Sequence, residues 1–205
     1  MNSIVQFCQD ILRKSRYGVT LDECMRALQT ACDFCKIPVP ETIYDLTNNP
    51  DGQTMFLNSN PDSYSDDILC YDLEQLKALG VNSYDGLTTI FVHENVHRLC
   101  QNKTIPGQMF GQWEGELVAD YFMGVRAYLE NLKIDSVIAG LAATRGSGSH
   151  PPGTLRKEYI NYGKTEAYLH TIRHIPFDIE DYYQCFLRYR QEHINDIRKA
   201  QMEIY

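Results

Sequence analysis

Two histidines and a glutamate within one short run are the residues of this chain best suited to chemistry. They are His93, Glu94 and His97, in the pattern H-E-x-x-H. On a helix, side chains four residues apart lie on one face with their Cβ atoms about 5–6 Å apart. Both imidazoles can therefore bind one zinc ion at about 2.0–2.1 Å. Glu94 lies roughly 100° round the helix from His93, where it can miss the metal and deprotonate a zinc-bound water.

The next predicted helix supplies a candidate third ligand. A catalytic zinc takes three protein ligands and keeps one position open, and Glu116 follows the motif across a predicted loop. Asp120 is four residues further on, hence on the same face, and could accept a hydrogen bond from a ligand imidazole. Glu114 is a rival ligand that points elsewhere on the helix. The alternatives are a solvated acidic face and two histidines that bind no metal.

These elements together resemble gluzincin-type peptidases. In those enzymes an E-x-x-A-D element follows H-E-x-x-H, as in CaaX-processing and HtpX-like membrane peptidases; here it is the run from Glu116 to Asp120. The chain is more similar still to the family of predicted soluble neutral zinc metallopeptidases, in which a glycine, here Gly124, follows. The resemblance covers about residues 54–170 and implies that Glu116 is the third ligand and Asp120 the partner of a ligand. Arg98 departs from the family, which prefers an uncharged residue after the second histidine.

A third family element is a Ser/Thr-His-Pro loop ahead of an arginine that opens a helix. The corresponding residues are Ser149-His150-Pro151 and Arg156. In the resembled enzymes this histidine and arginine reach the active site. The resemblance implies that His150 donates a hydrogen bond to a developing oxyanion and that Arg156 holds a substrate carbonyl or an active-site carboxylate. The alternative is a plain loop with a helix-capping turn.

Composition and charge limit the partners. Acidic residues number 27 against 19 basic ones, for a formal charge of -8, and no run of Lys or Arg provides the basic patch that nucleic acid needs. The apolar residues at the N-terminus are interrupted by polar ones, unlike a secretory signal. No apolar run approaches the roughly 20 residues of a membrane helix. We therefore expect no nucleic-acid or membrane partner and a cytoplasmic location.

Other cysteines and histidines give weaker signals. The seven cysteines are scattered and odd in number, which does not indicate a disulfide framework. Cys32 and Cys35 form a C-x-x-C pair on a helical pattern, with no second pair to complete a zinc knot. His170 and His174 are four residues apart near a helix end, but the sequence offers no obvious third ligand. We expect no second metal site at either place.

Apolar periodicity and turn residues divide the chain into three parts. Residues 1–40 are predicted to form a helical hairpin packed on the main domain, with Thr20 and Glu23 as the capping box of its second helix. Residues 41–175 are predicted as the metallopeptidase domain and residues 176–205 as a C-terminal helix. Within the main domain we expect strands at 54–57 and 68–71, a loop over 58–66, and helices at about 72–79, 84–101, 112–132, 134–143 and 154–170.

The predicted fold class is α+β and mainly helical. We expect a compact zincin-like domain with a small sheet, in which the active-site helix is crossed by the helix that carries Glu116. The strand near Ile68 is expected to form an edge that holds an extended peptide.

The sequence thus predicts a zinc metalloendopeptidase that acts on a peptide or protein, with Zn²⁺ on His93, His97 and Glu116 and with Glu94 as base. Two alternatives stay open. An ImmA-like repressor-cleaving peptidase usually shows E-x-x-A-N where this chain has Asp120, and lacks the Ser-His-Pro loop. A non-catalytic, metal-stabilised binding protein would use its aromatic C-terminal helix as the working surface. The oligomeric state is left open.

Overall fold

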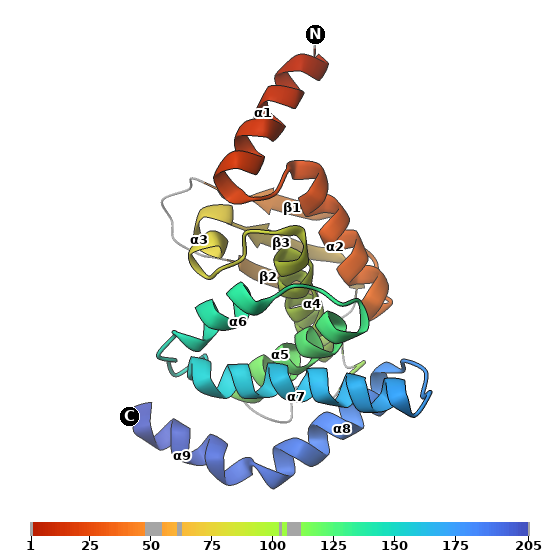
Figure 1. Cartoon of the computed structure of the whole chain (residues 1–205), viewed down its shortest axis with the longest axis vertical. Coiled ribbons are helices and arrows are strands. Elements are labelled where there is room, and N and C mark those ends of the chain that lie inside the picture. Colours follow the sequence, from red (N-terminus) through yellow and green to blue (C-terminus); the bar gives the residue numbers. More distant parts are fainter. Residues whose placement is uncertain (1, 48–54, 61–62, 103, 106–111, 205) are drawn as a thin grey trace.

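Helices make up most of the fold, and a small sheet lies beside them (Figure 1). The computed structural model describes residues 2–47, 55–60, 63–102, 104–105 and 112–204. The helices are α1 (Asn2–Tyr17), α2 (Leu21–Cys35), α3 (Leu73–Ala78), α4 (Tyr84–Gln101), α5 (Gln112–Leu129), α6 (Asp135–Ala142), α7 (Gly153–Ile172), α8 (Ile179–Glu192) and α9 (Ile194–Ile204). The strands are β1 (Thr42–Asp45), β2 (Met55–Asn60) and β3 (Ser63–Tyr71). The prediction of a mainly helical α+β fold is confirmed.

The sheet differs from the prediction in extent and in order. Its order is β1-β3-β2, with β1 parallel and β2 antiparallel to β3. The expected edge strand near Ile68 is therefore wrong, because β3 lies in the centre and Leu69, Cys70 and Tyr71 are all buried, as a strand covered on both faces requires. The loop predicted over 58–66 is also wrong, since β2 and β3 extend into it. Thr54 of the predicted strand at 54–57 lies outside the described residues.

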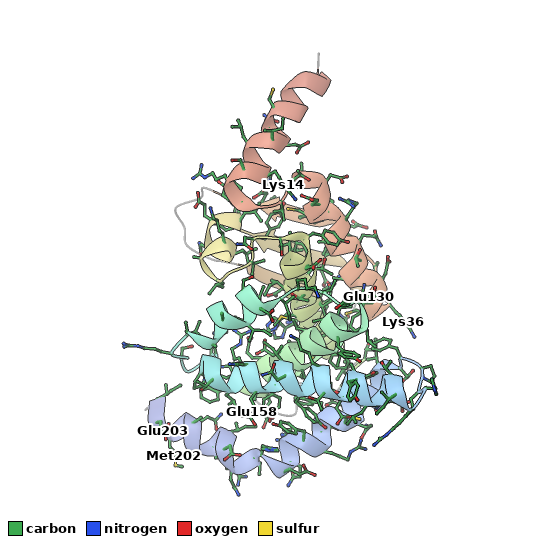
Figure 2. The ribbon with its side chains drawn as sticks, viewed as in Figure 1. Lys14, Lys36, Glu130, Glu158, Met202 and Glu203 are labelled. Carbon is green, nitrogen blue, oxygen red and sulfur yellow. The ribbon has the colours of Figure 1, made fainter. Side chains whose placement is uncertain are left out.

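The helices form successive layers around α4. One side of α4 packs against α2 and contacts β2, and the other packs against α5; α5 in turn packs against α7, and α7 against α6 and α8. Because α4 has neighbours on several sides, almost all its side chains are buried, as expected for a helix without a solvent face. Side chains fill the space between the layers, whereas labelled charged ones such as Lys36 and Glu130 point outward (Figure 2). The expected crossing of the motif helix by the Glu116 helix is thus present.

Two glycines allow α5 and α7 to approach closely. A Cβ atom on Gly124 of α5 would lie 2.0 Å from the carbonyl oxygen of Ile160 on α7. A Cβ atom on Gly163 of α7 would lie 2.0 Å from the carbonyl oxygen of Tyr121 on α5. Any larger residue would push the two helices apart. Gly124, which belongs to the family motif, therefore sets the distance from α5 to the helix that carries Arg156.

The chain ends confirm one local prediction and correct another. Thr20 and Glu23 form the predicted capping box at the start of α2. The single helix predicted from Asp178 to Ile204 is wrong, because α8 ends at Glu192 and His193 is its C-terminal cap. The His193 ring nitrogen Nδ1 lies 2.9 Å from the Tyr189 carbonyl oxygen, which satisfies a carbonyl at the helix end. The division into a hairpin, a main domain and a C-terminal segment stays a prediction.

Arg98, the residue that departs from the family pattern, is fully buried. Its guanidinium forms an ion pair with Asp67 on β3 and donates to the Pro38 carbonyl at 2.8 Å and to the Asn95 side chain at 2.9 Å. Asn95 in turn donates to the Cys32 sulfur at 3.3 Å, and burial raises the pKa of that thiol. The network joins α4 to the sheet and to α2, so Arg98 anchors the motif helix.

The pair between Asp67 and Arg98 yields a stability prediction. Asp67→Asn leaves a buried guanidinium without its counter-charge and should lower the free energy of unfolding by about 3–5 kcal/mol, measured by urea unfolding followed by circular dichroism. Asp22→Asn removes the partner of Arg26 in an exposed pair whose side chains are 76% and 60% accessible, and should cost under about 0.5 kcal/mol. Similar losses in both variants would contradict the anchoring role.

Candidate metal centre

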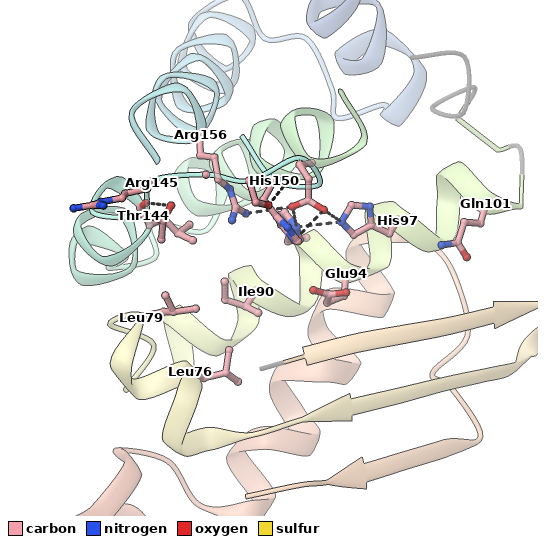
Figure 3. Close-up of a pocket in the computed structure, with 15 residues that line it drawn as sticks. Leu76, Leu79, Ile90, Glu94, His97, Gln101, Thr144, Arg145, His150 and Arg156 are labelled. Atoms are coloured by element: carbon pink, nitrogen blue, oxygen red, sulfur yellow. Dashed lines mark hydrogen bonds and ion pairs between the residues drawn. The ribbon is translucent and has the colours of Figure 1, made fainter. Parts of the chain in front are cut away.

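The side chains of His93 and His97 on α4 and of Glu116 on α5 converge. Figure 3 shows the cleft that they line, with His97 labelled. The two Nε2 atoms of the histidines lie 3.1 Å apart. The Glu116 carboxylate faces both of them, with Oε2 at 3.4 Å from His93 Nε2 and Oε1 at 3.3 Å from His97 Nε2. The potential ligand atoms all lie within 4.8 Å of one another. The structure thus brings the three predicted ligands together as a group that could hold a metal ion.

The spacing of these atoms matches what a small tetrahedral ion needs. Ligands placed at about 2.0–2.1 Å from a tetrahedral centre are separated from each other by about 3.3–3.4 Å. The two imidazole nitrogens are 3.1 Å apart, and each lies 3.3–3.4 Å from a different oxygen of Glu116, so each of these contacts is close to that value. Two imidazoles and one carboxylate also form a donor set that suits zinc. The residues therefore form a group that could hold a zinc ion.

Ionisation of the group shows that the centre favours positive charge. Burial by itself would lower the pKa of His93, but the Asp120 and Glu116 carboxylates raise it to about 10. Burial would raise the pKa of Glu116, yet His93 and His97 hold it well below its usual range. A site whose neighbours stabilise a proton this strongly on an imidazole also stabilises a divalent cation in the same place.

Asp120 lies between a ligand histidine and Arg156. Its Oδ1 is 3.0 Å from His93 Nδ1, within ion-pair distance although the ring N–H is not aligned for a hydrogen bond. Arg156 donates two hydrogen bonds to the same carboxylate, at 2.7 and 2.8 Å. Burial would raise the pKa of Asp120, but Arg156 and then His93 lower it. Asp120 is thus placed to orient His93, as carboxylates commonly do for ligand imidazoles.

Arg156 contacts two carboxylates through its guanidinium. Besides its bonds to Asp120, one of its nitrogens lies 3.7 Å from Oε2 of Glu116. The Arg156 side chain is only 11% accessible. Of the two roles that the resemblance implies for Arg156, holding an active-site carboxylate is the one for which contacts are present.

The ligand group opens into a cleft of about 620 Å³. Glu94 is half-buried and lines this cleft beside His93 and His97. Among the described residues, none forms a hydrogen bond or ion pair with the Glu94 carboxylate, which leaves it available to a molecule in the cleft. The walls also include Leu76, Leu79, Ile90, Gln101, Leu141, Thr144, Arg145, Gly146 and Ser147.

His150 lies on the loop between α6 and α7, at the rim of the cleft. Its Nε2 atom is 3.8 Å from Oε1 of Glu116, and its side chain is 56% accessible. Its backbone N–H donates to the Ser147 hydroxyl at 3.1 Å, and the Trp113 indole donates to the Ser147 carbonyl at 2.9 Å. The sequence analysis missed Trp113, whose signal is its place at the start of the ligand-bearing helix. Trp113 ties the His150 loop to α5.

Glu114, the rival ligand, contacts a different helix. Its Oε1 accepts hydrogen bonds from Arg190 of α8 at 3.1 and 2.7 Å. On α5 its side chain therefore points toward α8, and Glu116 points to the cleft. The choice of Glu116 over Glu114 agrees with the helix geometry.

Replacing Asp120 tests its contact with His93. Asp120→Asn should weaken zinc binding at this centre about 10–100-fold, the usual effect of losing the partner of a ligand imidazole, measured by competition with a chelator. Glu114→Gln is the matched control, because it also removes from α5 a carboxylate that is paired with an arginine. This variant should leave the zinc affinity unchanged. Equal affinities in wild type and Asp120→Asn would contradict the orienting role.

Comparison with known proteins adds no relative. None of the described helices combines the length with the apolar character that crossing a bilayer requires. The resemblance to gluzincin-type peptidases rests on the motif residues of the sequence alone. No protein-family model, curated protein or solved structure matches this chain.

Proposed function

We propose that the protein is a zinc-dependent peptidase with a zincin-like catalytic domain that hydrolyses peptide bonds. The observation that supports this most is the convergence of His93, His97 and Glu116, as a group that could hold a metal ion, at the wall of a cleft that Glu94 also lines. Zinc held there would supply Lewis acidity, which lowers the pKa of water toward about 7 and polarises a carbonyl. The proposal includes the identity of the metal as zinc.

Glu94 acts as general base and then as general acid. It is the residue after His93 on α4, so its carboxylate projects to a different side of the helix from the ligand imidazoles. Its half-buried position in the cleft wall lets it take a proton from the attacking water and return it to the leaving amine. The ligand Glu116 cannot share this role, because both of its oxygens face the imidazoles.

His150 supplies a hydrogen-bond donor at the rim. Its Nδ1 lies 2.9 Å from the Ser149 hydroxyl, so Ser149 can donate to Nδ1 and leave the proton of the ring on Nε2. That Nε2–H is the atom nearer Glu116, and it can donate to the negative oxygen that develops on the substrate. Arg156 does not contact the substrate in this mechanism; it holds Asp120 and, through it, the orientation of His93.

The substrate is a peptide in extended conformation. Strand β2 is an edge of the sheet, contacts α4, and pairs on its outer side with none of the described strands. An extended segment can add to such an edge through backbone hydrogen bonds. The edge that could hold the peptide is therefore β2, and not the strand near Ile68.

One end of the cleft is apolar. Leu76 of α3, Leu79 after it and Ile90 of α4 lie together at one end of the cleft (Figure 3). His97 and Gln101 lie toward its other end. Leu141 of α6 also lines the cleft. An apolar wall next to the reacting groups favours a large apolar side chain beside the bond that is cut.

Replacing Glu94 tests the enzymatic function. Glu94→Gln should lower kcat about 10²–10⁴-fold because proton transfer is lost, while zinc content stays that of the wild type. His97→Ala should lose the zinc of this centre together with the activity. Activity is measured on a mixed peptide library, with new termini detected by mass spectrometry. Full activity in Glu94→Gln would reject this mechanism, and zinc binding without turnover in the wild type would favour a metal-stabilised binding protein.

Replacing Leu79 tests the apolar end of the cleft. Leu79→Ala should lower kcat/KM about 10-fold for peptides with a large apolar side chain beside the cleaved bond, since each lost methylene contact weakens transition-state binding. Peptides with a small side chain there should be affected less. Gln101→Ala, at the other end of the cleft, is the control and should not change this preference. An unchanged preference in Leu79→Ala would place the specificity elsewhere.

A further inference from the structure

A second group of metal-binding side chains lies between α7 and α8. Glu166 and His170 are one turn apart on α7, and Cys185 faces them from α8. His170 Nε2 is 3.8 Å from the Cys185 sulfur and 4.0 Å from Oε2 of Glu166. The three potential ligand atoms lie within 4.8 Å of one another. His170 lies fourteen positions after Arg156 on α7, or about 20 Å along the helix, so this group is distinct from the centre on α4.

The buried ring of His170 is weakly paired. The residue is 7% accessible, and its Nδ1 has no hydrogen-bond partner among the described residues. Its Nε2 makes a long hydrogen-bond contact of 3.8 Å to the Cys185 sulfur, and its 4.0 Å contact to Glu166 is longer than the usual 2.7–3.2 Å of an N–H···O bond. The Nε2 atom, which faces both side chains, is therefore placed to bind a further partner.

A metal ion fits the gap between the three side chains. Zinc binds a thiolate at about 2.3 Å and an imidazole at about 2.0–2.1 Å, which places the two atoms about 3.6 Å apart in a tetrahedron. The 3.8 Å between Cys185 Sγ and His170 Nε2 is close to that separation. Arg188 donates to the same sulfur at 3.0 Å. The Tyr182 ring packs 4.4 Å from the His170 ring and covers it.

We propose that Glu166, His170 and Cys185 form a second zinc site that fastens α8 to α7. Thiolate, imidazole and carboxylate are its ligands, and water completes the coordination at the partly accessible Glu166 side. As the zinc–sulfur bond forms, the Cys185 thiol releases its proton to solvent. Arg188 remains as the hydrogen-bond donor to the ligand sulfur. The site is independent of the proposed peptidase function.

The four-residue spacing along the chain pairs His170 with His174, and this is the wrong pair of candidate metal ligands. His174, four residues after His170, is exposed and lies beyond the end of α7 with a φ of 56°. The partners of His170 are instead the residue one turn earlier and a cysteine on the next helix. The expectation that no second metal site exists in this region rested on the absence of a third ligand from the sequence, and α8 supplies one.

Cobalt binding to the full-length chain tests the second site. Co²⁺ bound to a thiolate gives an intense sulfur-to-metal charge-transfer band, whereas the donors of the α4 centre are nitrogen and oxygen and give none. Metal-free protein titrated with Co²⁺ should show this band. Cys185→Ser should abolish it, and Glu166→Gln, a change at the accessible side that spares the packing, should weaken cobalt binding at least 10-fold. Cys8→Ser, at an exposed cysteine, should keep the band.

The two centres can be tested separately with one further pair of variants. His97→Ala should keep the charge-transfer band and should still gain thermal stability when zinc is added. His97→Ala combined with Cys185→Ser should gain none. The absence of a band at saturating Co²⁺ in wild type, or its persistence in Cys185→Ser, would overturn the second site. Absence of hydrolysis by the wild-type protein, with the band present, would count against the peptidase proposal alone.

Discussion

The geometry of the ligand group depends on one buried carboxylate, that of Asp120. It accepts two hydrogen bonds from Arg156 of α7 and faces His93 of α4 from its own helix α5. A buried carboxylate is tolerated only where opposite charge and hydrogen bonds compensate for its lost hydration, so these three helices must meet here. The close approach of α5 and α7 at Gly124 and Gly163 makes that meeting possible.

A second buried charge holds α4 from the opposite side. Arg98 joins α4 to β3 through Asp67, and to the segment after α2 through the Pro38 carbonyl. The helix that carries both ligand histidines is therefore fixed at one face by Arg98 and at the other by Asp120. Side chains locked by packing and hydrogen bonds keep a metal site in its binding geometry. Arg98, which breaks the family pattern, stabilises the same helix that the pattern identifies.

Carboxylates outnumber guanidinium groups around the ligand group. Glu94, Glu116 and Asp120 lie at or next to it, and Arg156 contacts two of them. A zinc ion in the proposed site would add positive charge among these carboxylates while both histidines bind it in neutral form. Asp120 and Glu116 raise the pKa of His93, and the two histidines lower the pKa of Glu116, so each group stabilises the opposite charge on its neighbour.

The sequence by itself determined which candidate site residues share one face of a helix. Residues four apart on one helix share a face, so the pairing of His93 with His97 and of Glu116 with Asp120 could be predicted without a structure. The helix predicted over about 84–101 agrees with α4, whereas the one predicted over about 112–132 extends beyond the end of α5 at Leu129. Contacts between elements were decided only by the tertiary structure, because they depend on packing over long separations. These include the central place of β3, the pairing of Arg98 with Asp67, and the meeting of His170 with Cys185. No local pattern records which buried charge or thiol faces which helix, since that choice is made when the layers pack together.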